Sequence, residues 1–135
     1  MCLSIEVDSP ERVLSKGEHA GYEFVTVHNG MGYRCGYVRV PKGHPWHGKF
    51  EEELEVDVHG GLTFGQPDKP CDKGGEDDAY WLGFDCAHYG DAADPELPAA
   101  YRGPSSFKGV VRTQDYVESE CRSLCRQAAL AAKQA

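Results

Sequence analysis

Four reactive side chains stand within seven residues in the second half of the chain. Asp85, Cys86, His88 and Asp91 follow the apolar segment 80–84 directly, and Gly90 lies among them. A strand end is a good place for a site, because the sheet fixes the side chains and a glycine lets a ligand approach the backbone. The spacing therefore predicts a functional site where this segment ends.

A second apolar stretch ends in a similar way. His59 is followed by Gly60 and Gly61, and Thr63 comes shortly after them. Strands that are sequential in the chain often lie side by side. We therefore expect His59 and residues 85–88 to share one pocket, at corresponding ends of neighbouring strands.

Catalysis and metal binding are two chemistries that suit this set. In an enzyme, Cys86 would be the nucleophile, His59 or His88 the general base and Asp85 the carboxylate that orients the base. In a metal site, His59, Cys86, His88 and Asp91 would supply ligands, although no familiar zinc spacing occurs. The local signature of a cysteine hydrolase is also absent.

The third chemistry is binding of a polar ligand through hydrogen bonds, with the N–H groups around Gly60 and Gly61 forming a small nest for a phosphate. Trp46, on a loop that contains His44 and His47, would then be a lid that stacks on the ligand, or else part of the core. A structural interpretation stays open, in which the aspartates accept turn N–H groups and Cys86 is a small core residue. The candidate ligand-binding residues are Trp46, His59, Gly60, Gly61, Thr63, Asp85, His88 and Asp91.

The elements that must position these groups are mainly strands. Alternating or apolar β-branched and aromatic patterns predict them, and Asn29-Gly30 predicts a hairpin turn. Residues 10–17 fit either a helical turn or a loop, and residues 66–78 and 91–104 fit loops. The expected strands cover residues 3–8, 22–28, 33–40, 54–59, 62–64, 79–85 and a short edge strand within 107–112.

Two of these strands carry the geometric prediction. In residues 54–59 the apolar side chains of Leu54, Val56 and Val58 face a core, so His59 faces the opposite side. Residues 80–84 are apolar on both sides, which predicts a central strand covered on both faces.

One long helix is expected at the C-terminus. Thr113 can cap it and Asp115 suits the positive end of its dipole. With 135 residues the chain predicts a single domain, 1–135, of the α+β class: a mainly antiparallel sheet with this helix packed against it. The apolar stripe of the helix is Val117, Cys121, Leu124, Cys125 and Ala128.

The net charge of −8 excludes some partners. It disfavours duplex nucleic acid and anionic membranes, both of which need a basic surface. A phosphate-bearing ligand would still need a local cation. The candidate cations are Arg34, Arg39, Lys42, Lys49 and Arg102.

Two other kinds of partner stay open. The acidic stretches 51–53 and 76–78 suggest a protein that binds a host protein through an acidic surface. The exposed edges of the expected sheet would allow a homo-oligomer.

The cysteines and the N-terminus concern the compartment. Six cysteines occur without C-x-x-C spacing, and the first residues carry neither a basic region nor an apolar one typical of a secretion signal. We therefore expect free thiols and a cytoplasmic protein.

Three stretches together resemble a family of small, largely uncharacterised proteins of tailed bacteriophages and prophages. They are residues 37–45, residues 58–64 (VHGGLTF) and residues 81–91 (WLGFDCAHYGD). The start of the C-terminal helix, residues 115–121, fits as well. The resemblance covers roughly residues 33 to 126.

The resemblance implies a phage origin, and small acidic phage proteins often counter host defence. The expected function is therefore binding of a small nucleotide-like ligand, with sequestration of a host immune signalling nucleotide. The alternative is a hydrolase that cleaves such a nucleotide with His59, Asp85, Cys86 and His88. The sequence identifies no cofactor and no metal.

Overall fold

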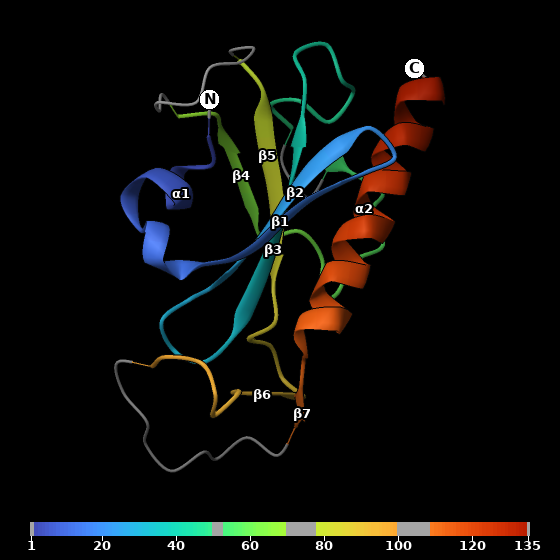
Figure 1. The fold of residues 1–135 in the computed structure, drawn as a ribbon. Coiled ribbons are helices and arrows are strands. Elements are labelled where there is room, and N and C mark those ends of the chain that lie inside the picture. Colours follow the sequence, from blue (N-terminus) through green and yellow to red (C-terminus); the bar gives the residue numbers. More distant parts are fainter. Residues whose placement is uncertain (1, 50–52, 70–77, 100–108, 135) are drawn as a thin grey trace.

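The computed structural model describes residues 2–49, 53–69, 78–99 and 109–134. Within these described residues, two short helices come first, seven strands follow, and a long helix comes last (Figure 1). The elements are α1 (Ser4–Asp8), the 3-10 helix η1 (Pro10–Arg12), β1 (Val13–His19), β2 (Tyr22–His28), β3 (Arg34–Val40), β4 (Phe64–Pro67), β5 (Tyr80–Asp85), β6 (Asp91–Ala92), β7 (Val110–Val111) and α2 (Gln114–Gln134).

The main sheet has five antiparallel strands in the order β1-β2-β3-β5-β4. The strands β6 and β7 form a separate parallel pair beneath it. The predicted α+β architecture, with an antiparallel sheet and a C-terminal helix packed against it, is confirmed.

The sheet is covered on both faces (Figure 1). α2 packs across β1, β2 and β3 on one face, and its buried stripe is the predicted set Val117, Cys121, Leu124, Cys125 and Ala128. The short α1 lies on the opposite face, where Leu3 packs in a second cluster with Val27 and Trp81.

Gly36 shows why α2 can lie so close to the sheet. A Cβ at this position would stand 2.5 Å from the Cys121 sulfur and 2.6 Å from the Phe84 ring. Only a glycine on β3 leaves room for the helix at this point, so the N-terminal half of α2 can pack closely on β3.

The predictions for β2, β3, β5 and α2 are confirmed, with boundaries within one residue of those expected. The predicted hairpin is present, since β2 pairs with β3 and the Asn29 side chain accepts N–H bonds inside the connection. β5 is an interior strand between β3 and β4, with Trp81 buried on one face and Leu82 and Phe84 on the other. Its predicted central position is therefore also confirmed.

The prediction of a strand over residues 54–59 is wrong, although the alternation is real. Val58 is buried, Leu54 and Val56 are half-buried, and the residues between them are more exposed, yet no strand forms there. The backbone lies against α2, where the Gln127 side chain bonds the N–H and C=O of Asp57. Helix side chains thus satisfy a strand-like backbone, and burial alone does not distinguish this from sheet pairing.

The prediction of a strand over residues 3–8 is also wrong, because residues 4–8 form α1. Leu3 is fully buried, and its N–H donates to the Glu6 side chain in the manner of a helix start. Residues 62–64 join the sheet only at Phe64, and β4 then runs through Pro67, inside the segment expected to be loop. The three apolar-polar pairs in residues 3–8 are too short a pattern to exclude a short helix.

Three further segments settle differently from their sequence patterns. Residues 10–12 form a helical turn, η1, as one of the two options had it, whereas residues 13–17 belong to β1, which neither option included. Two-residue strands occur at 91–92, within an expected loop, and at 110–111, within the expected edge strand, whose residues 107–108 lie outside the described residues. None of the described helices is long and apolar enough to cross a membrane.

The expectation of free thiols holds for Cys35, Cys86, Cys121 and Cys125, which are buried. It is wrong for Cys2, which is disulfide-bonded to a partner outside the described residues. The count of cysteines and the absence of C-x-x-C spacing carry no information on this bond, which depends on which chain segments meet.

Candidate functional site

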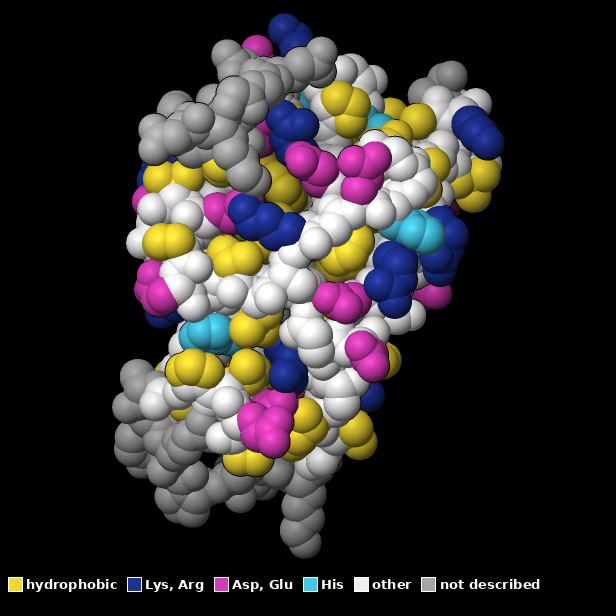
Figure 2. Space-filling model, viewed as in Figure 1, with side chains coloured by type: hydrophobic (Ala, Val, Ile, Leu, Met, Phe, Trp, Pro, Cys, Tyr) yellow, Lys and Arg dark blue, Asp and Glu magenta, His cyan; other side chains and the backbone are white. Residues whose placement is uncertain are grey.

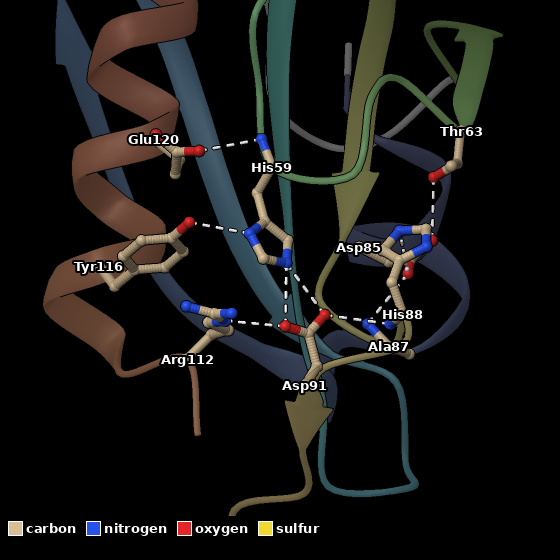
Figure 3. A network of polar contacts seen from close by, with 9 residues as sticks. All are labelled: His59, Thr63, Asp85, Ala87, His88, Asp91, Arg112, Tyr116 and Glu120. Atoms are coloured by element: carbon tan, nitrogen blue, oxygen red, sulfur yellow. Dashed lines mark hydrogen bonds and ion pairs between the residues drawn. The ribbon is translucent and has the colours of Figure 1, made fainter. Parts of the chain in front are cut away.

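Asp91 is the centre of a polar network at the end of the sheet (Figure 3). Its side chain is 1% exposed and accepts hydrogen bonds from three donors: His59 Nε2 at 2.9 Å, Arg112 Nε at 2.7 Å and the His88 backbone N–H at 3.0 Å. Burial raises the pKa of Asp91, but the hydrogen bonds from His59, Arg112 and His88 more than offset this, and the net pKa lies below its usual value. Asp91 is therefore held as a carboxylate.

The His59 ring is bonded at both nitrogens. Nε2 donates to Asp91, and Nδ1 lies 2.8 Å from the Tyr116 hydroxyl. In the neutral ring Nδ1 accepts the phenol hydrogen. The backbone N–H of His59 donates to Glu120, so α2 fixes both the main chain and the side chain of this residue.

Arg112, which lies just before α2, is the third side chain bonded into this network. Its guanidinium carbon lies 5.2 Å from the centre of the Tyr116 ring, in a cation–π contact. The Arg112 carbonyl accepts a hydrogen bond from Arg34, which also pairs with Asp94 at 2.9 Å. The chain before α2 is therefore tied to β3.

His88 lies between this network and the opposite face of the sheet. The centres of the His59 and His88 rings are 6.2 Å apart. His88 packs on Gly60, where a Cβ would stand 2.4 Å from the ring, and Gly60 has a φ of +69°. A glycine is needed here for two reasons, the positive φ and the space that the imidazole fills.

Asp85 is the polar group on the other side of His88. Its carboxylate accepts bonds from the Thr63 hydroxyl at 3.0 Å and the Ala87 N–H at 3.1 Å (Figure 3). His88 Nε2 stands 3.1 Å from Asp85 Oδ1, close enough for an ion pair, but the angles do not make a hydrogen bond. Among the described residues this buried nitrogen therefore has no hydrogen-bond partner.

A pocket of about 500 Å³ opens beside these groups. Its polar lining residues include Thr63, Asp85 and His88, and Tyr37 and Phe64 supply an aromatic wall with ring centres 4.8 Å apart. This volume is within the range of small-molecule sites. The full lining is Asn29, Cys35, Tyr37, Thr63, Phe64, Phe84, Asp85, Ala87 and His88.

The structure thus brings His59 close to the segment 85–91, as expected, but by a different route. His59 and the segment 85–91 do not lie at the ends of paired strands, because residues 54–59 form no strand. His59 and Asp91 belong to the internal network, and Thr63, Asp85 and His88 line the pocket. The predicted single cluster is therefore two adjacent clusters that meet at His88.

Cys86 does not have the environment of a nucleophile. It is 1% exposed and packs in the core beneath α2, and burial, with Asp91 adding to it, raises the pKa of its thiol to about 12. A reactive cysteine needs a lowered pKa and access to its substrate. This geometry favours the structural interpretation of Cys86.

Trp46 is part of the core, so its role as a lid is not supported by its position. It is 5% exposed and packs against the His44 ring, with ring centres 5.3 Å apart. His44 donates from Nε2 to the carbonyl of Ala128, in the C-terminal half of α2. Its Nδ1 accepts a hydrogen bond from the backbone N–H of Trp46. His44 is itself buried, with 7% of its surface exposed.

The turn at Gly60 and Gly61 does not offer a phosphate nest. Both residues have positive φ, and the Gly61 N–H donates to the Val58 carbonyl at 2.9 Å. A nest needs free N–H groups on residues of alternating hand. The metal interpretation fares no better, because the described residues contain no group of three or more ligands that could hold a metal ion.

The candidate cations lie elsewhere or are already paired. Arg34 pairs with Asp94, and Arg39 pairs with Asp68 at 2.8 Å. Lys42 stands 4.0 Å from Asp78, and Arg102 lies outside the described residues. Figure 2 shows acidic and basic side chains interspersed over one face, with no continuous basic surface in that view.

Sequence reasoning missed three members of this network: Tyr116 and Glu120, which bond His59, and Arg112, which bonds Asp91. They lie on or just before α2, more than 50 residues from His59, and no short-range spacing connects them. One signal was available: Tyr116 and Glu120 are four apart, so they share a helix face beside the predicted apolar stripe.

Fold and site together define a small α+β domain with a five-stranded antiparallel sheet and a pocket at one end of it. No protein-family model, curated protein or solved structure matches this chain.

Proposed function

We propose that the protein binds a small nucleotide-like ligand in the pocket beside Asp85 and His88. The observation that carries this proposal is the composition of the pocket: a carboxylate, a hydroxyl and an imidazole face an aromatic wall in a space of about 500 Å³. Aromatic rings suit the faces of a nucleobase, and a carboxylate accepts hydrogen bonds from its amino and ring N–H groups.

Binding without turnover is the better supported form of this proposal. His59, a candidate general base, has both nitrogens occupied by Tyr116 and Asp91. The Cys86 thiol is buried and its pKa is raised. A ligand sponge needs neither group, whereas the hydrolase alternative would depend on His88 and Asp85 alone.

The biological setting remains the one that the phage resemblance suggests. In that setting the ligand is a host immune signalling nucleotide, and the protein removes it from the host cytoplasm by sequestration. The Cys2 disulfide is at odds with a reducing cytoplasm. Counting free thiols in protein purified under alkylating conditions tests this location: six would support it, and four would contradict it.

The test is calorimetric titration with the common ribonucleosides, their 5′-monophosphates, and cyclic di- and trinucleotides. We expect at least one of them to bind, and Asp85→Asn to weaken that binding about tenfold, since a hydrogen bond to a charged group is lost. Asp57→Asn, at an exposed position beside α2, is the matched control. If no compound binds, or if Asp85→Asn leaves the affinity unchanged, the proposal is wrong.

A second measurement separates the sponge from the hydrolase. After long incubation the protein is denatured and the released ligand is analysed by mass spectrometry. Intact ligand supports sequestration. If the wild type yields a cleaved product and the His88→Gln variant does not, the hydrolase alternative replaces sequestration.

A further inference from the structure

We propose that Arg12, at the rim of this pocket, binds the phosphate of the ligand while the base occupies the interior. This inference rests on the proposed function and makes it more specific. It assigns the ligand class as an aromatic base carrying an anionic phosphate, and it assigns a cation that the sequence did not single out.

The position of Arg12 follows from the hairpin that borders the pocket. A Cβ on Gly30 would stand 3.1 Å from Arg12 Nη2 and 3.4 Å from its Cζ. Gly30 directly follows Asn29, which lines the pocket. The guanidinium therefore lies over the turn at the pocket's edge, where η1 leads into β1.

The electrostatic environment of Cys35 agrees with this placement. Cys35 lines the pocket, and burial together with Asp85 raises the pKa of its thiol to about 11, against a lowering effect of Arg12. Arg12 is thus close enough to act electrostatically on a residue of the pocket wall.

The guanidinium is also available. Arg12 is exposed, and within the described residues no carboxylate or carbonyl bonds to it. Arg34, Arg39 and Arg112, by contrast, each already pair with a buried aspartate. An unpaired guanidinium can present two N–H groups to one phosphate.

The charge inside the pocket fixes the orientation of the ligand. None of the lining residues is a lysine or arginine, and Asp85 is a carboxylate. A phosphate placed deep in the pocket would meet this carboxylate without a compensating cation. With the base inside and the phosphate at the rim, each end of the ligand meets complementary chemistry.

The experiment compares each nucleoside with its 5′-monophosphate by calorimetric titration, using wild-type protein and Arg12→Gln. For the 5′-monophosphate that binds most tightly, we expect the wild type to bind it about tenfold more tightly than the corresponding nucleoside. Arg12→Gln should remove this preference and leave nucleoside affinity unchanged. Arg126→Gln is the matched control, because it removes the same charge at an exposed position near His19, at the other end of β1.

Two further variants sharpen the result. Arg12→Lys should keep only part of the preference, since it retains the charge but loses the pair of N–H groups that a guanidinium presents to one phosphate. Gly30→Ala should reduce it, because the added methyl group displaces the guanidinium. Nucleoside binding with no phosphate preference, or a preference that survives Arg12→Gln, overturns the assignment of Arg12 and leaves the pocket intact. If neither nucleosides nor nucleotides bind, the proposed function fails and this inference with it.

Discussion

Asp85 and Asp91 are six residues apart, and each carboxylate stands beside a histidine, yet they are in opposite situations. The Asp91 side chain is 1% exposed and holds three donors. The Asp85 side chain is 32% exposed and faces a pocket. The His59 nitrogens are both bonded, whereas His88 Nε2 has no hydrogen-bond partner among the described residues.

This difference separates groups that hold the fold from groups that can meet a ligand. A polar network in which every donor and acceptor is already paired stabilises one arrangement and has no free donor or acceptor for a ligand. A polar group at a pocket wall with spare capacity can exchange water for a ligand. Composition and spacing favoured both aspartates equally, and only their partners distinguish them.

The largest expected effect is on stability, from Asp91→Ala. The substitution leaves His59 and Arg112 without their acceptor, and removing one member of a buried charged pair costs on the order of 3 kcal/mol. Urea unfolding measures the loss of free energy. Asp57→Ala, at an exposed site, should cost less than about 0.5 kcal/mol, and an equal loss in the two variants would contradict the role of the network.

A smaller effect is expected from Gly60→Ala, and it probes the contact between the two clusters. An alanine must adopt a φ of +69° and place its methyl group 2.4 Å from the His88 ring. Gly61→Ala is the control, since it meets the same backbone strain at a φ of +80° with no atom within 4 Å. Positive φ costs about 1 kcal/mol in either case. Gly60→Ala should cost about 1 kcal/mol more and also weaken ligand binding, as calorimetry can show.

The pH dependence of unfolding should be weaker still and have two windows. A group whose pKa is lowered in the folded state binds its proton more readily when unfolded, so stability is lost on acidification. For Asp91 this loss begins below about pH 4. For His44, burial lowers the pKa, and the loss begins below about pH 6.5.

Urea titrations at a series of pH values measure both windows. His44→Gln should flatten the slope between about pH 5 and pH 7, because it removes that ionisation. Asp91→Asn should flatten it only below about pH 4. Stability that rises on acidification in the wild type would contradict both assignments.

The smallest expected effect concerns Cys86. Its buried thiol, with a pKa of about 12, should react with iodoacetamide no faster than Cys35, Cys121 or Cys125 in the native state. Peptide mass spectrometry after timed labelling gives the rates. Cys86→Ala should leave ligand affinity unchanged, and selective labelling of Cys86 would return the nucleophile hypothesis to consideration.

The amino-acid sequence by itself determined the strands with strong apolar patterns and the long helix. β2, β3 and β5 are rich in β-branched and aromatic residues, and α2 has a cap and an apolar stripe, so local preference and burial agree there. It also determined that polar groups gather where β5 ends. Where the pattern was short, as in residues 3–8 and 54–59, alternation of burial did not determine the backbone's hydrogen-bond partners.

Only the tertiary structure decided what each polar group does. His59 is bonded by Tyr116 and Glu120 because α2 passes beside it, and the Arg12 guanidinium lies next to Gly30 because η1 and the β2–β3 hairpin meet in the fold. These contacts join residues far apart in the chain, so no spacing predicts them. Asp85 and Asp91 have the same side chain, and they differ because a buried carboxylate must be surrounded by donors while one at a pocket wall need not be.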